Sequence, residues 1–435
     1  MAGELSIRSA VPDPRLLDLP WREPLELWPD STIAVLPKGI SRHLVRFVRG
    51  DGDVLAVKET TRELAESEYE MLRNLQRLAL PAVEPIAVVT GRHDLDGEEL
   101  APVLITRHLR FSLPYRAVYS QSLRPETAIR LIDALAVLLV RLHIQGFFWG
   151  DVSLSNTLFR RDAGAFAAYL VDAETGRLYD DGLSDGQRAN DLEIARVNVA
   201  GELLDLQAGG RLDEGVDPVA VAESIVATYR ALWAELTGSE SIPETERWRI
   251  NERVERLNDL GFDIEELAIR TGDDGARLLI QPKVVDAGHH SRRLLRLTGI
   301  DAEENQARRL LNDLDEFRVT TGAGDERDDE EQAAHDWVTT VFEPVIRAIP
   351  RDLRGKLEPA EVFHQLLDHR WYLSQNDRRN VPLAEALASY VEKVLRHRRD
   401  EITVVAPVTE TLSIPLSTGE LRAIEPDDED WRARV

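Results

Sequence analysis

Cysteine is absent from the 435-residue sequence. The protein therefore has no disulfide, no thiolate nucleophile and no cysteine-ligated metal, and this composition fits a reducing compartment. Long hydrophobic runs are absent as well: the longest, around 131–140, is interrupted by Asp133 and is too short to span a bilayer. The first residues contain no basic region followed by an apolar stretch, as a signal peptide would. We therefore expect a cytoplasmic protein with no membrane span.

Basic residues are scarce relative to acidic ones. The chain contains 53 Lys and Arg against 78 Asp and Glu, a net charge of −25. The average field of such a protein repels phosphate backbones and anionic lipid headgroups. We therefore expect no nucleic acid and no anionic membrane as a partner. The motifs G-x-S-x-G, H-E-x-x-H and G-x-x-x-x-G-K-[ST] are also missing, so the sequence does not support a serine hydrolase, a zinc protease or a Walker-type ATPase.

What the sequence does contain is the composition of a globular protein with a large core. Hydrophobic residues make up 43% and charged residues 30%, which excludes collagen-like and disordered classes. At about 100–200 residues per domain, the length predicts two or three domains. Residues 1–30 are rich in proline, with Trp21 and Trp28 as apolar anchors, and predict an extended arm that lies on a domain. The further divisions that we predict are 31–108, 109–235, 236–400 and an acidic tail at 401–435.

The first of these divisions predicts a small sheet with one helix. The runs 43–48 and 54–57, joined by a turn at 50–53, predict a β-hairpin. Apolar residues at helical spacing predict a helix over Arg62–Leu78, which ends before Pro81. Further strand-like runs lie at 33–36, 86–90 and 102–106.

The later divisions predict mainly helices. A long amphipathic helix over Pro125–His143 precedes two short strands, Thr157–Phe159 and Ala168–Val171, with a turn around 162–164. The pattern is helical again over 191–236 and mostly helical over 240–400. We expect the acidic stretch 325–331 to form a solvated loop, and the run 402–405 to be β-rich.

Two charged residues of the first division predict a phosphate-binding pair. Lys58 ends the apolar run 54–57, so packing would fix its stem and direct its ammonium into a cleft, where it can bind phosphate oxygens. Glu68 follows ten residues later, four residues before Leu72, and its carboxylate would hold Lys58 in place and keep it charged. A surface lysine and a solvated acidic helix face are the alternatives.

Three residues of the second division complete a constellation for phosphoryl transfer. Asp151 is followed five residues later by Asn156, between a long helix and a short strand, which is the spacing of a kinase catalytic loop. In such a loop the Asp accepts the proton of the substrate hydroxyl and the Asn ligates magnesium. Asp172, sixteen residues after Asn156 at the end of the next strand, stands where a second magnesium ligand belongs.

These residues resemble the protein-kinase-like superfamily over about 31–230, and specifically the bacterial lipopolysaccharide-kinase-like proteins and their small-molecule phosphotransferase relatives. Segments 36–43, 171–175 and 371–374 look like a bacterial family that joins such a half to a C-terminal domain of unknown function. The resemblance implies an α+β, bilobal kinase-like fold that binds ATP. Its small β-rich N-lobe would be 31–108 and its helical C-lobe 109–235, with an additional, mostly helical C-terminal domain at 236–400.

The sequence departs from the kinase pattern at three places. A G-x-G-x-x-G loop is absent; only Gly39 lies in the expected phosphate-covering hairpin, so side chains of Lys38, Ser41 and Arg42 would substitute for it. Trp149 stands where the His of the catalytic loop usually stands. Ala173-Glu174 replaces Phe-Gly after the metal-binding Asp, which argues against a phosphorylation-switched activation loop.

We interpret the protein as an ATP- and magnesium-dependent phosphotransferase that acts on a hydroxyl of a small molecule, a sugar or a lipid-linked glycan. Lys58 and Glu68 would position the phosphates, Asp151 would be the base, and Asn156 and Asp172 would hold Mg²⁺. A nucleotide-binding, pseudokinase-like regulator is the alternative, with a protein partner bound through the C-terminal domain. Protein phosphorylation and nucleotidyl transfer on the same fold also stay open.

Other polar residues admit two interpretations each. Asp191 either braces the catalytic loop or caps a helix. The adjacent pair His289-His290 points in two directions on a helix, which argues against a metal site. The stretch 281–297 holds four basic residues against one acid, and these either bind an anionic acceptor or pair with the acids at 301–304 and 325–331. The four are Lys283, Arg292, Arg293 and Arg296.

Overall fold

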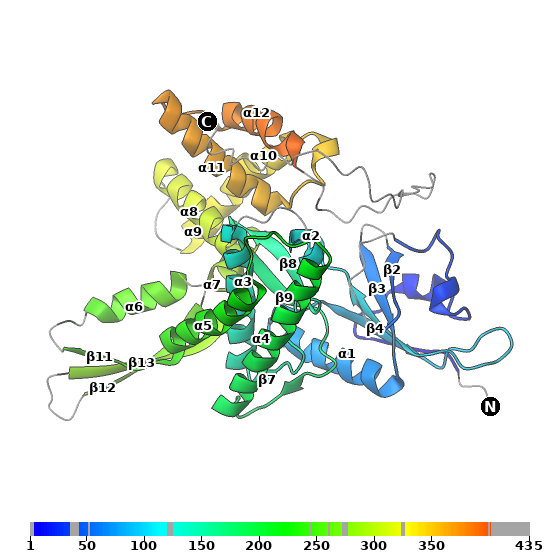
Figure 1. Ribbon diagram of the computed structural model, residues 1–435. Helices are drawn as coiled ribbons and strands as arrows, with labels where there is room; N and C mark the ends of the chain where they lie inside the picture. Colours follow the sequence, from blue (N-terminus) through cyan, green and yellow to red (C-terminus); the bar gives the residue numbers. More distant parts are fainter. Residues whose placement is uncertain are drawn as a thin grey trace.

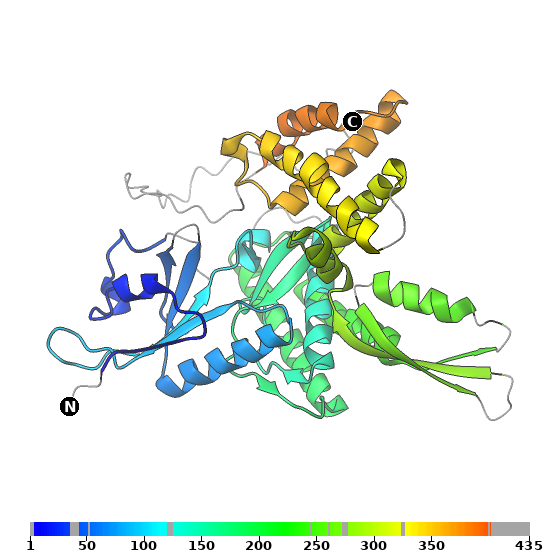
Figure 2. The same cartoon turned by 180° about the vertical axis from the view of Figure 1, so that it is seen from behind.

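The computed structural model describes residues 4–34, 43–50, 53–119, 125–243, 246, 248–259, 262–271, 277–322, 327–398 and 401. A β-rich N-lobe, a helical C-lobe and a C-terminal helical region follow one another along the chain (Figures 1 and 2). The predicted α+β, bilobal fold class is confirmed. The predicted phosphate-binding residues Lys38, Gly39, Ser41 and Arg42, and the β-rich run 402–405, lie outside the described residues.

The N-lobe is an antiparallel sheet with one helix. Within the described residues its strand order is β1-β4-β5-β3-β2. Helix α1 begins after Thr61, whose side chain accepts a hydrogen bond from the Leu64 amide at 3.4 Å, and it buries the face formed by Ala65, Tyr69, Leu72 and Leu75. The hairpin and the helix were both predicted, whereas β1 was not. The bounds are β1 (Ser6–Ser9), β2 (Val45–Arg49), β3 (Val54–Glu59), α1 (Arg62–Arg77), β4 (Pro85–Thr90) and β5 (Val103–Arg107).

The N-terminal segment is folded onto the outer side of this sheet. Its two short 3₁₀ helices, η1 (Pro14–Asp18) and η2 (Leu25–Leu27), bury Leu16 and Leu25. Trp21 and Trp28 are each 4% exposed and meet edge to face, with ring centroids 5.3 Å apart. Both pack with strand residues such as Val48 and Val57 in one hydrophobic cluster, so the two tryptophans act as the anchors that the sequence predicts.

The C-lobe is built around a long buried helix and a β-hairpin. Helix α3 packs against β9 and α5, and α4 packs against α5. Strands β8 and β9 pair over their full length, and the turn between them uses Ala163 and Gly164, both with positive φ (51° and 86°). The elements are β6 (Leu113–Pro114), α2 (Tyr115–Tyr119), α3 (Pro125–Ile144), β7 (Phe147–Phe148), β8 (Thr157–Asp162), β9 (Ala165–Leu170), β10 (Arg177–Leu178), α4 (Asp185–Ala208) and α5 (Pro218–Thr237).

Another sheet follows the C-lobe helices and corrects part of one prediction. The region predicted to be mostly helical, 240–400, contains α6 (Trp248–Asp259) and further helices, but the prediction missed a sheet of order β11-β13-β12 at its start. The strands are β11 (Glu240–Pro243), β12 (Phe262–Thr271) and β13 (Arg277–Ala287). Strands β12 and β13 contain five Ile and Val residues, and such residues favour strands when they pack on a neighbouring strand. Leu257 and Phe262 are buried in the same hydrophobic cluster as the C-lobe.

The remaining described residues form a helical region with its own core. Large apolar side chains such as Trp337, Phe342 and Phe363 fill it. The acidic loop prediction was wrong from Arg327 onward, because α9 buries Ala333, Ala334 and Trp337 on one face and so stabilises a helix. The elements are α7 (His289–Thr298), α8 (Glu304–Thr321), α9 (Arg327–Trp337), a π-helical turn (Val338–Phe342), α10 (Glu343–Ala348), η5 (Arg351–Leu353), α11 (Pro359–Asp377), α12 (Leu383–Lys393) and η6 (Leu395–His397).

Across the described part of the chain, no helix combines the length and the hydropathy that a membrane span requires.

Candidate functional site

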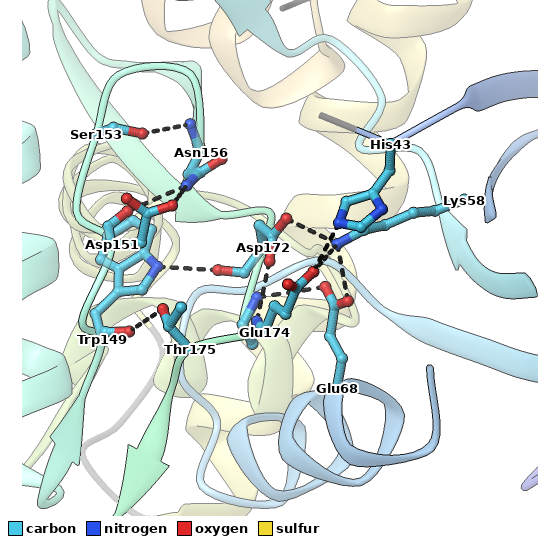
Figure 3. Close-up of polar contacts among 11 residues, drawn as sticks. His43, Lys58, Glu68, Trp149, Asp151, Ser153, Asn156, Asp172, Glu174 and Thr175 are labelled. Atoms are coloured by element: carbon cyan, nitrogen blue, oxygen red, sulfur yellow. Dashed lines mark hydrogen bonds and ion pairs between the residues drawn. The ribbon is translucent and has the colours of Figure 1, made fainter. Parts of the chain in front are cut away.

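One ammonium group joins the two lobes. Lys58, at the end of β3, places its Nζ 3.0 Å from Glu68 Oε2 on α1 and 2.8 Å from Asp172 Oδ2, just after β9 (Figure 3). A third carboxylate, Glu174, lies 3.2 Å from the same nitrogen and also contacts His43 Nε2 at 3.0 Å. One lysine that is surrounded by acids therefore links the N-lobe to the C-lobe.

The charges in this cluster favour the charged form of Lys58, whereas the carboxylates repel one another. Burial alone would lower the pKa of Lys58, but the carboxylates of Glu68 and Asp172 outweigh that effect and raise it, so the amine is an ammonium at neutral pH. Burial raises the pKa of Glu68, and the charge of Asp172 adds to that shift, while Lys58 opposes it. Glu68 is only 2% exposed and accepts a further hydrogen bond from the Ala173 amide at 3.4 Å.

The second part of the site is the loop between β7 and β8. Asn156 Nδ2 donates to the Oδ2 atom of Asp151 at 3.1 Å and to its backbone oxygen at 3.1 Å (Figure 3). These contacts close the loop on itself, with Ser153 Oγ accepting from the Asn156 amide at 3.1 Å. The side-chain nitrogen of Asn156 donates both of these hydrogen bonds to Asp151, whereas the side-chain oxygen, Oδ1, is the atom that could bind a metal ion.

Helix α4 holds this loop with three polar side chains. Asp191 accepts from the Trp149 and Gly150 amides at 2.7 Å each. Asn198 donates to Asp151 Oδ1 at 3.3 Å, and Glu202 accepts from two amides further along the loop, those of residues 154 and 155, at 2.7 and 2.9 Å. Positions 191, 198 and 202 share one face of a helix, since they are seven and four residues apart. The helix thus fixes the loop at three successive points.

Trp149 connects the loop to the lysine cluster. Its side chain is fully buried, and its Nε1 donates to the Asp172 backbone oxygen at 2.9 Å. Thr175 Oγ1 in turn donates to the Trp149 backbone oxygen at 2.7 Å. The Val171 amide donates to the Asn156 backbone oxygen at 3.0 Å. Because Val171 directly precedes Asp172, this bond places the backbones of the two predicted metal ligands, Asn156 and Asp172, next to each other. Tryptophan at this position therefore carries a structural role.

The donor set suits a hard divalent cation. One carboxylate oxygen each from Glu68, Asp172 and Glu174 lies within 4.8 Å of the others. Asn156 offers an amide oxygen from the adjoining loop, where its backbone oxygen accepts from the Val171 amide. Oxygen ligands of this kind are those that Mg²⁺ prefers. Three carboxylates against one lysine leave the cluster negatively charged, so a divalent cation would reduce their repulsion. The residues present therefore fit a magnesium ion.

The structure brings together the predicted residues that it describes. Lys58, Glu68 and Asp172 form one cluster, Asp151 and Asn156 form the adjacent loop, and Asp191 braces that loop from within α4 and not from a helix cap. Sequence reasoning assigned no role to four contributors: His43, Glu174, Asn198 and Glu202. The last two had a usable signal, because with Asp191 they form a polar stripe along an otherwise buried helix face.

The basic stretch 281–297 forms ion pairs where it is described. Arg293 lies 2.7 Å from Glu330 and 3.9 Å from Asp315, and His290 Nδ1 lies 2.7 Å from Glu304. These contacts join α7 to α8 and α9. They favour the salt-bridge interpretation of this stretch over an anion-binding surface.

The C-terminal part of the chain matches a known family of domains. A family model described as Domain of unknown function (DUF4032) matches residues 231–395, which confirms that such a domain occupies the C-terminal part of the chain. No curated protein matches the sequence. A solved structure of WaaP in complex with acyl carrier protein is similar with a TM-score of 0.35 and 16% identity, over 58% of this chain and 99% of that chain.

Proposed function

We propose that the protein is an ATP- and magnesium-dependent phosphotransferase that acts on a hydroxyl of a small molecule, a sugar or a lipid-linked glycan. The observation that supports this most is the position of Lys58, whose ammonium bridges Glu68 of the N-lobe and Asp172 of the C-lobe. The Asp151–Asn156 loop, which Trp149 joins to Asp172, supplies the remaining groups that such a transfer requires.

Each residue has a distinct role in this proposal. Lys58 binds phosphate oxygens of ATP, and Glu68 holds the ammonium in position. Asp172 and Asn156 would hold the metal ion, with Glu174 as a further carboxylate beside Asp172. Lys38, Gly39, Ser41 and Arg42 stay proposed contacts to the phosphates. Bound magnesium would neutralise charge on the phosphate oxygens of the nucleotide.

Asp151 is the proposed base. In the transfer, the acceptor oxygen forms a bond to the γ-phosphorus of ATP, the bond from that phosphorus to the bridging oxygen breaks, and ADP leaves. The acceptor hydroxyl gives its proton to the carboxylate of Asp151. Asn156 and Asn198 each donate to one oxygen of this carboxylate, so its orientation is fixed before a substrate arrives. Such preorganisation lowers the cost of reaching a reactive geometry.

One observation favours a second candidate function, a nucleotide-binding, pseudokinase-like regulator. The carboxylate of Glu174 lies 3.2 Å from the Lys58 ammonium and would compete with the phosphate oxygens of ATP for this contact. A protein that binds nucleotide without turnover would tolerate this competition. A catalyst requires that the nucleotide with its metal displace Glu174 from Lys58.

Two measurements on the full-length protein test the proposal. Millimolar ATP with magnesium is expected to raise the melting temperature and to change tryptophan fluorescence, because a ligand that binds only the folded state stabilises it. Incubation with ATP labelled at the γ or the α phosphorus, together with a metabolite extract, should transfer the γ label. Transfer of the α label would indicate nucleotidyl transfer, and binding without any transfer would favour the regulator. A folded protein with no response to ATP contradicts both.

We propose the cytoplasm as the compartment, since ATP is available there as the phosphoryl donor. The acceptor is the expected partner of the catalytic half. A protein partner would bind through the C-terminal region.

A further inference from the structure

The β8–β9 hairpin connects the candidate site to the C-terminal helical region. Its base carries the proposed metal ligands, because Asn156 immediately precedes β8 and Asp172 lies two residues after β9. The two strands pair from Thr157↔Leu170 to Asp162↔Ala165, so the turn and the base belong to one ribbon. Among the described residues, strand β6 pairs with β8 only opposite Leu158 and Phe159, so the part of the ribbon beyond Phe159 has no third strand beside it. A two-stranded ribbon has little stability of its own in water. What holds its far end therefore affects the position of its base.

The helical region holds that far end through the Asp162 side chain and through two backbone groups of the hairpin. Asp162, only 3% exposed, accepts from the Gln306 amide and from Asn305 Nδ2, both at 2.8 Å. Gln306 Nε2 donates to the Arg161 backbone oxygen at 2.9 Å, and Glu361 accepts from the Ala163 amide at 3.0 Å. The turn and the residues before it thus have hydrogen bonds to both α8 and α11.

Charged side chains strengthen the same contact. Arg160 Nη1 lies 2.9 Å from Glu303, and the guanidinium also pairs with Glu358; the side chains of these three residues are only 12%, 9% and 15% exposed. Tyr169, near the end of β9, donates to Glu303 Oε1 at 2.7 Å. Arg161 pairs with Glu401 at 2.7 Å. A protein loses much stability when one partner of a buried ion pair is removed. The hairpin is therefore held in the position in which these pairs form.

The base of the hairpin also contacts the N-lobe. The Leu170 amide donates to the Pro81 oxygen, and the Val83 amide donates to the Leu170 oxygen, both at 2.9 Å. Residues 81–83 follow α1, which carries Glu68. The hairpin therefore contacts the C-terminal helices at its turn. At its base it carries the proposed metal ligands and contacts the segment that follows α1, the helix that positions Lys58 through Glu68.

We propose that the C-terminal helical region is a positioning module for the phosphoryl-transfer site, and that Asn305, Glu303 and Glu361 act through the β8–β9 hairpin to set the placement of Asn156 and Asp172. This inference rests on the proposed function for its catalytic meaning. It assigns a role to a large part of the region that matches a domain of unknown function. The three named residues are positioning residues, since they contact the hairpin and not the reacting atoms.

The test compares the paired variant Asn305→Ala with Tyr169→Phe against Arg309→Ala, all in the full-length chain. The pair removes one hydrogen bond at each end of the hairpin, and both buried acids keep a partner: Asp162 keeps the Gln306 amide and Glu303 keeps Arg160. Arg309 lies on the same helix, α8, but pairs with Asp368 inside the helical region, so its loss affects that region alone. The first readout is hydrogen exchange without nucleotide. The amides at 156–157 and 170–172 should exchange about 3- to 10-fold faster in the paired variant than in the wild type. In the control variant their exchange rates should equal those of the wild type.

The second readout is the magnesium concentration needed for half-maximal ATP binding. It should rise about 3- to 10-fold in the pair and stay within about twofold of wild type in the control. Faster exchange together with a wild type that does not bind ATP would refute the proposed function while the mechanical coupling stands. Unchanged exchange, or unchanged magnesium dependence in a wild type that does bind ATP, would show that these contacts only stabilise the fold and would overturn the inference.

Discussion

Asp151 and Asp172 are both carboxylates of the site, yet their surroundings differ. Asp151 has a side-chain amide on each oxygen, from Asn156 and Asn198, and no cation contacts it among the described ion pairs. Asp172 contacts the Lys58 ammonium at 2.8 Å and receives the Glu174 amide at 2.9 Å. The first arrangement orients a base, whereas the second places a charge beside the phosphates and the metal.

We therefore predict different effects for the two isosteric variants. Asp151→Asn should lower turnover by about 10²-fold or more and leave ATP affinity nearly unchanged, because a base acts in the transition state. Asp172→Asn should weaken magnesium-dependent ATP binding itself, since a metal ligand acts already in the ground state. Label transfer and ATP titration separate the two outcomes. Equal loss of nucleotide affinity in both variants would contradict this division of roles.

At the scale of residues, the sequence was informative where a side chain ends an apolar run. Lys58 lies near the end of β3, Asp172 follows β9, and Glu68 precedes a buried leucine by four residues, so spacing alone placed them. Glu174 and His43 could not be found in this way. The contacts of Glu174 with His43 and Lys58 depend on how the two lobes pack against each other, and no local pattern of residues predicts that packing.

Among the elements, α4 has the largest effect on the site. Its residues Asp191, Asn198 and Glu202 contact successive parts of the loop at 149–155, while Ala195, Val199 and Leu203 bury the adjoining face in the core. Core packing fixes the rotation of the helix about its axis, and that rotation directs the polar stripe at the loop. The helix therefore converts hydrophobic packing into the orientation of Asp151.

This arrangement predicts the behaviour of Asn198→Ala. The variant loses the hydrogen bond to Asp151 Oδ1 and to the Val152 backbone oxygen, so turnover should fall about tenfold, with ATP affinity and melting temperature little changed. Asn190→Ala provides a matched control, because it removes an exposed asparagine from the same helix. A drop in turnover of equal size in both variants would show that the effect is not specific to Asp151.

The prediction of elements was accurate where periodicity and turn signals agreed. Helix α1, the β2–β3 hairpin and α3 follow from apolar spacing and from turn residues. The strands β12 and β13 were missed because, in a long stretch that is otherwise helical, Ile and Val favour a strand only once a partner strand is present. Helix α9 was missed for a similar reason, since its acidic sequence suggests a loop until Trp337 is seen in the core.

At the scale of the whole molecule, contacts between distant segments decide the geometry. The bonds from Asn305 and Gln306 to Asp162 join residues more than 140 positions apart in the chain. Local patterns in the sequence predict each segment but contain no information on which segments meet. For this reason the order of lobes and the constellation of the site could be predicted, while the attachment of the C-terminal helices to the β8–β9 hairpin could not.

Buried ionisable groups at these contacts make stability depend on pH in opposite directions. Burial raises the pKa of Asp162 to about 7 and, at the same interface, that of Glu358 to about 7. These acids bind a proton more tightly in the folded state, so their contribution to stability falls as the pH rises from about 4 toward 7. Burial lowers the pKa of His369 to about 4, which has the reverse effect: stability falls as the pH drops below 6.5.

His108, at the junction between the lobes, allows one such contribution to be isolated. It follows β5, its ring meets Phe47 edge to face at 5.4 Å, and burial lowers its pKa from 6.5 to about 4. The unfolded chain therefore binds a proton between these values and the folded protein does not, so acidification destabilises the fold. From pH 7.5 to pH 5 the wild type should lose about 2 kcal/mol more unfolding free energy than His108→Gln, which cannot titrate. Urea denaturation of both proteins at the two pH values measures this difference directly, and the acids named above cancel because both proteins contain them. A parallel loss in wild type and variant would mean that His108 titrates normally and that the junction around it is open to water.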